Sequence, residues 1–177
     1  MDFDYFQTIS LEESSHYSTF EIKKAFDFNF DPSEYWVANT YNGYFKICFP
    51  FHYLSIESFE ITTSSKDCRP VKIAAEASAN GIDYRGRQEY EPRMEKGTTK
   101  QFLFNYNTSL IKCFKFYSIQ STCQDMGGDI NQFEFFGYLY DINATMKHFG
   151  CYKAMHLSCN FHYSFGSIGL FLIFSIL

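Results

Sequence analysis

Residues 71–81, VKIAAEASANG, decide the fold class of this chain. Apolar side chains recur at every second position of this stretch, at Val71, Ile73, Ala75 and Ala77. Because side chains alternate between the two faces of a β-strand, the pattern predicts a strand with one buried face. Asn80-Gly81 follows directly, and this pair favours a tight turn between strands.

The same combination of short strands and turns continues along the chain. We predict further strands over residues 44–49, 54–63, 101–106, 111–119 and 132–140, and a first strand near 20–22. The phase shift at Ser58-Phe59 predicts a β-bulge, and 111–119, apolar on both faces, is predicted to be central. Residues 83–100 and 120–131 are predicted loops. The chain is therefore expected to be all-β, an antiparallel β-sandwich or jelly roll.

Composition supports this fold class and excludes some partners. Aromatic residues make up 21% of the chain, with 22 Phe and 14 Tyr, and both types favour strands. The net charge is −5, which argues against binding to nucleic acid or to an anionic membrane surface.

Three regions are expected: a lead-in over 1–7, the β-sandwich over 8–141, and an irregular tail over 142–177. The apolar run that closes the tail is too short to span a membrane, and it is expected either to pack on the sandwich or to make a weak membrane contact. Residues 1–10 have no basic residue and no apolar run after them, so they do not resemble a secretory leader. An intracellular chain with six free thiols is therefore predicted.

Four passages in order resemble the discoidin, or coagulation factor type C, domain of the galactose-binding-like superfamily. They are Ala25-Phe26-Asp27 with Asp31-Pro32-Ser33-Glu34-Tyr35-Trp36, then 54–63, 71–84 and 130–140. The resemblance covers about residues 8–141 and implies a core position for Trp36. The terminal disulfide common in secreted members is missing, the loop before Trp36 is short, and the Arg-x-Asp element of fucose-binding relatives is absent.

The resemblance also implies a non-catalytic module that binds a protein or a glycan through loops at one end of the sandwich. The candidate ligand-binding residues are Phe28, Tyr41, Asn42, Tyr84, Arg85 and Arg87. The two Arg flank a Gly beside a Tyr, and guanidinium groups recognise carboxylates or phosphates. The competing interpretation pairs these Arg with Glu89 or Glu91 in an ordinary solvated loop.

No enzyme is expected, because no nucleophile elbow, P-loop or zinc-protease motif is present. No cofactor is predicted beyond a weak Ca²⁺ candidate at Asp27 and Asp31, two carboxylates without a fuller set of oxygen ligands. A structural appendage without a ligand site, cut from a larger protein, is the alternative to a binding module.

Overall fold

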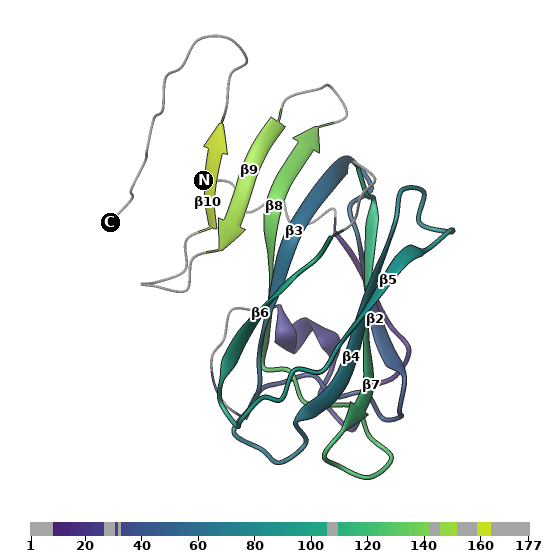
Figure 1. Cartoon of the computed structure of the whole chain (residues 1–177), viewed down its shortest axis with the longest axis vertical. Helices are drawn as coiled ribbons and strands as arrows, with labels where there is room; N and C mark the ends of the chain where they lie inside the picture. Colours follow the sequence, from purple (N-terminus) through teal and green to yellow (C-terminus); the bar gives the residue numbers. More distant parts are fainter. Residues whose placement is uncertain are drawn as a thin grey trace.

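The computed structural model describes residues 9–26, 31, 33–105, 110–141, 146–151 and 159–163, and they form two antiparallel five-stranded sheets packed face to face (Figure 1). The first sheet has the order β1 (Ser10–Glu13), β2 (Gly43–Cys48), β7 (Cys113–Ser121), β4 (Pro70–Ser78), β5 (Arg85–Tyr90). The second has the order β10 (Cys159–Tyr163), β9 (Met146–Cys151), β8 (Gln132–Asp141), β3 (His52–Thr62), β6 (Thr99–Leu103). A short 3-10 helix, η2 (Ile22–Ala25), lies beside them. The predicted antiparallel β-sandwich is confirmed.

Aromatic side chains fill the space between the sheets. Trp36 is completely buried, as the resemblance implied, and its ring meets Phe45 edge to face at 5.4 Å between centroids. Phe59 of β3 stacks on Phe133 of β8 at 5.4 Å, and both meet Phe116 of the opposite sheet. Such ring pairs contribute about 0.5–1.5 kcal/mol each beyond the area they bury.

Two finer predictions about the strands are also confirmed. The register of β3 against β8 shifts between Ile56 and Ser58, which is the predicted bulge and returns Phe59 to the core. The strand β7 lies between β2 and β4 in the middle of its sheet.

Three predictions about secondary structure are wrong. Residues 85–90, predicted as loop, form the edge strand β5. Their polar sequence has no alternation that indicates a strand, and the pairing with β4 is what holds them in one. The first strand is β1 rather than residues 20–22, where η2 begins. The tail over 142–177 is not wholly irregular, because β9 pairs with β8 and β10 pairs with β9.

The prediction of six free thiols is wrong for four of them. Disulfides join Cys48 to Cys113 and Cys68 to Cys123. The first links directly opposite positions of β2 and β7, and the second links two loops. Disulfides persist mainly in oxidising compartments, so they give no support to an intracellular location, which stays a prediction.

The strand β7 defines two ends of the sandwich, called here the Cys113 end and the Ser121 end after its first and last residues. Nine residues of strand separate them by about 27 Å. The turn 78–84 lies at the Cys113 end, since Ser78 pairs with Cys113. The loops 63–69 and 122–131 lie at the Ser121 end, the lower end in Figure 1. Among the described residues no helix is long and apolar enough to cross a membrane.

Candidate functional site

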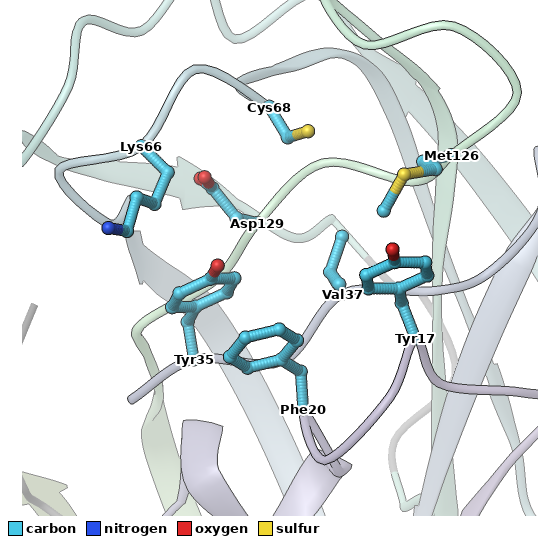
Figure 2. A pocket seen from close by; sticks show the side chains of 8 residues that line it. All are labelled: Tyr17, Phe20, Tyr35, Val37, Lys66, Cys68, Met126 and Asp129. Atoms are coloured by element: carbon cyan, nitrogen blue, oxygen red, sulfur yellow. The ribbon is translucent and has the colours of Figure 1, made fainter. Parts of the chain in front are cut away.

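A pocket of about 180 Å³ opens at the Ser121 end of the sandwich (Figure 2). At roughly 30 Å³ per molecule, it holds about six waters, the space of one small ring or end group. Four separate segments contribute its walls, which are formed by Tyr17, Phe20, Tyr35, Val37, Lys66, Cys68, Met126 and Asp129.

The aromatic side of the pocket comes from two segments that run beside each other. The Tyr17 N–H donates to the Val37 carbonyl at 3.0 Å, which holds the segment after β1 against the segment before β2. The rings of Phe20 and Tyr35 then stack at 4.3 Å, with an angle of 12° between their planes. Tyr17 stacks more distantly on Phe20, at 6.4 Å. The three rings thereby form one continuous wall.

The opposite side is the loop between β7 and β8, and two glycines bring its backbone close to the core. The Gly128 N–H donates to the Ser118 Oγ at 2.6 Å, and a Cβ on Gly128 would lie 2.6 Å from the backbone of Pro70. The next N–H, from Asp129, donates to the Cys68 carbonyl at 2.6 Å. Only glycine fits at position 128, directly before Asp129. The resulting close approach of the backbone to Pro70 places the Asp129 carboxylate in the interior.

Asp129 is completely buried, and its two oxygens differ in their surroundings. The Oδ2 atom accepts a hydrogen bond from the Ser64 hydroxyl at 2.8 Å. The Oδ1 atom exposes less than 1 Å² and has no hydrogen-bond partner among the described residues. Figure 2 shows the carboxylate pointing into the space between Lys66, Cys68 and Tyr35. A buried acceptor without a hydrogen bond lowers the stability of the folded chain. A ligand that donates a hydrogen bond to this oxygen would remove that cost, which would strengthen its binding.

Burial raises the pKa of Asp129 to about 6, with a further increase from the charge of Asp67, and the Ser64 hydrogen bonds oppose it. Burial and the Asp129 charge also raise the pKa of the nearby Tyr35 phenol. At neutral pH the pocket therefore holds a mainly ionised carboxylate in poorly solvated surroundings.

We expect Asp129→Asn to stabilise the chain in a pH-dependent way. Between about pH 4 and pH 6 the folded chain keeps a proton on Asp129 that the unfolded chain, with its pKa near 3.8, has released. The wild-type free energy of unfolding therefore falls as the pH rises through this window, by on the order of 2–3 kcal/mol, and the amide does not titrate. Urea unfolding at pH 4 and pH 8 gives the free energy of unfolding of the variant and of the wild type. The variant should exceed the wild type by more at pH 8 than at pH 4. Equal differences at both pH values would contradict the assignment.

Other charges around the pocket are exposed or half-buried and largely paired. Asp67 pairs with Lys96, and Arg69 donates to Glu95 at 3.0 Å, so the loop 63–69 is tied to the loop 91–98. Lys66 is exposed at the rim and has no ion pair among the described residues. Water screens such surface charges strongly, and Asp129 is left as the dominant fixed charge of the pocket.

The structure does not bring the predicted binding residues together. Tyr41 and Asn42 lie at the Ser121 end, where the Tyr41 hydroxyl donates to the Cys123 carbonyl and Asn42 adopts a left-handed turn conformation at φ 57°. Tyr84 and Arg85 lie at the opposite, Cys113 end, beside Ala77 and Ser78. Phe28 lies outside the described residues.

Arg87, the remaining predicted residue, is occupied by contacts within the chain. Its guanidinium lies over the ring of Tyr117 at 4.5 Å and pairs with Glu89 at 3.6 Å. The Tyr84 ring lies 5.4 Å from the Lys115 ammonium, on the outer face of the first sheet. Burial raises the pKa of the Tyr84 phenol to about 12. The Arg87–Glu89 ion pair fits the competing interpretation, in which these Arg pair with Glu89 or Glu91, although the stretch forms the strand β5 and not a loop.

The weak calcium prediction stays a prediction. Asp27 lies outside the described residues. The Asp31 Oδ1 atom accepts from the Ser33 N–H at 2.8 Å and the Ser33 hydroxyl at 2.7 Å, the arrangement of an Asp-initiated turn. Among the described residues no three His, Cys, Asp or Glu side chains gather as a metal site.

Sequence reasoning missed most of the pocket. Tyr35 stands within the passage around Trp36 that carries the resemblance. Asp129 stands directly after Gly127-Gly128 in the predicted loop 120–131, and no motif marks it as a site residue. The Gly-Gly pair before an acidic residue was the one available signal, because it indicates a close approach of the backbone. Nothing in the sequence links Tyr17 to Lys66.

The fold has many solved neighbours, whereas no family model and no curated protein matches the sequence. A family 32 carbohydrate-binding module of Clostridium perfringens NanJ, solved with galactose, is 14% identical over 74% of this chain and 95% of that chain, with a TM-score of 0.58. A second module from the same organism, solved with GalNAc-β-1,3-galactose, is 14% identical over 75% of this chain and 98% of that chain (TM-score 0.60). The C-terminal domain of a Bacteroides fragilis chitobiase is 10% identical over 77% of this chain and 98% of that chain (TM-score 0.62). The chain therefore shares the β-sandwich fold of these solved domains.

Proposed function

We propose that the chain is a non-catalytic glycan-binding module whose ligand occupies the pocket at the Ser121 end. The observation that carries this proposal is the unpartnered Oδ1 atom of Asp129 beside the wall of Tyr17, Phe20 and Tyr35. A sugar ring presents apolar C–H groups on its face and hydroxyl donors at its edge. An aromatic wall with one buried acceptor matches both features.

The neighbouring structures add support from an independent direction. One of them was solved in complex with galactose and another with GalNAc-β-1,3-galactose. The pocket described here is small and has few polar groups, which suits one terminal sugar residue rather than a long chain. Binding is therefore expected to be weak for a monosaccharide and stronger for a multivalent display.

The test compares two tyrosines at opposite ends of the full chain. Tyr35→Ala should lower affinity for the best glycan of an array by about 10- to 100-fold, since a buried aromatic contact contributes roughly 1.5–3 kcal/mol. Tyr84→Ala, the same change at the Cys113 end, should leave the affinity within two-fold. Isothermal titration gives both values.

A folding control separates loss of the site from loss of the fold. Tyr35 stacks on Phe20, so Tyr35→Phe is included because it keeps the stack and removes only the hydroxyl. Thermal unfolding and circular dichroism should show that all variants are folded. Loss of binding in Tyr84→Ala but not in Tyr35→Ala would move the ligand to the Cys113 end. No binding to any glycan would favour the structural appendage instead.

A further inference from the structure

The charge of the pocket narrows the ligand beyond glycans in general. Only two of the eight lining residues carry charge, Lys66 and Asp129, and they differ in burial. Asp129 is completely buried and Lys66 is exposed. A charge in poorly solvated surroundings acts on a ligand more strongly than a charge that water screens. The pocket should therefore respond to ligand charge as an anionic site.

The groups that face Asp129 from the surrounding segments do not cancel this charge. Ser64 donates to its Oδ2 atom, which leaves Oδ1 free. Tyr17 and Tyr35 line the pocket with their aromatic rings, and the raised pKa of the Tyr35 phenol keeps that group neutral. On the loop 63–69, the nearby charges of Asp67 and Arg69 are each paired with the loop 91–98.

The aromatic wall also favours a cationic ligand, as the Asp129 carboxylate does. Ring faces and phenolic oxygens attract cations, and cation recognition in proteins commonly combines aromatic rings with a carboxylate. A neutral hydroxyl donor would satisfy the Oδ1 atom but would leave the buried charge without a counter-ion. An ammonium group would satisfy the oxygen and neutralise the charge together. A sugar acid would bring a second anion beside Asp129, which is repulsive.

We propose that the pocket selects a sugar residue that carries an amino group in its cationic form, with the ammonium donating to Asp129 Oδ1. This inference rests on the proposed glycan-binding function and makes Asp129 the residue that determines specificity. Uncharged sugars then bind less tightly, and sugar acids bind least.

The test uses methyl glycosides of galactosamine, galactose, N-acetylgalactosamine and galacturonic acid with the full chain at pH 7. The first three differ only in the group at one ring carbon, so they isolate the effect of charge. Galactosamine should bind at least ten-fold more tightly than galactose and N-acetylgalactosamine, with galacturonic acid weakest. Asp129→Asn should make the affinity for galactosamine equal to the affinity for galactose. It should also reduce the difference in affinity between galactose and galacturonic acid. The variant amide can still accept from Ser64, so the loop should keep its fold, which thermal unfolding checks.

Two controls make the result specific to the buried carboxylate. Asp125→Asn removes the same charge from an exposed position on the same loop. Its ratio of galactosamine affinity to galactose affinity should stay within two-fold of the wild-type ratio. At pH 5, below the Asp129 pKa of about 6, the wild-type preference should shrink because the carboxyl becomes neutral while the sugar ammonium stays charged. A preference that survives in Asp129→Asn, or that is unchanged at pH 5, would overturn the inference.

The remaining outcomes separate this inference from the function on which it rests. If galactose binds and galactosamine binds no better, the amino-sugar inference fails while the glycan-binding module stands. If none of the four sugars binds and a wider glycan array is also blank, the proposed function itself fails.

Discussion

Replacement of Phe133 by alanine should lower the free energy of unfolding by roughly 3–5 kcal/mol. Phe133 is 2% exposed, and its ring lies within about 6 Å of the Phe26 ring after η2 and of rings from both sheets, namely Phe45, Phe59, Phe114, Phe116 and Phe135. Removal of the ring leaves a cavity lined by rigid aromatic neighbours that cannot collapse into it. Urea unfolding followed by intrinsic fluorescence measures the change.

Phe51→Ala is the matched control for this prediction. Phe51 is 56% exposed, so the same chemical change opens no cavity and should cost less than about 1 kcal/mol. A similar loss in both variants would mean that the rings do not form the packed centre of the sandwich.

Removal of either disulfide should cost the next largest amount, roughly 2–5 kcal/mol, but only one removal should affect the pocket. The two bonds close segments of similar length, with sequence separations of 65 and 55 residues, so their entropic contributions are close to about 4 kcal/mol each. Cys68 lines the pocket, and its bond to Cys123 joins the loops 63–69 and 122–131. Cys48–Cys113 lies at the far end of the sandwich.

The experiment compares Cys68→Ser/Cys123→Ser with Cys48→Ser/Cys113→Ser. Both should unfold at lower urea concentration than the oxidised wild type, whose two bonds mass spectrometry verifies. Glycan affinity should fall in the first double variant and remain near wild type in the second. Equal affinities in the two variants would show that the loops hold the pocket together without the disulfide.

The sequence alone determined the fold class, because it rests on local alternation. The alternation of Ile73, Ala75 and Ala77, the phase shift at Ser58 and the aromatic spacing of 132–140 each specify a strand face without knowledge of the partner strand. Val71 was predicted on the same buried face and is 37% exposed, because the register of β4 against β7 shifts beside it. Trp36 was also placed correctly. The edge strand Arg85–Tyr90 was missed, since its polar residues carry no alternation and only the pairing with β4 makes it a strand.

The candidate site depended on tertiary structure. Tyr17, Tyr35, Lys66 and Asp129 are spread over more than 110 residues, and they meet because antiparallel strands return loops from different parts of the chain to the same end. The predicted residues Tyr41 and Tyr84 were separated for the same reason, since the direction of each strand decides the end at which its loop emerges. The sequence shows that Asp129 is polar. Its burial and its unpartnered oxygen depend on the tertiary contacts of Gly128 with Pro70 and Ser118. Local patterns report which face a side chain occupies, and only packing decides which side chains become neighbours.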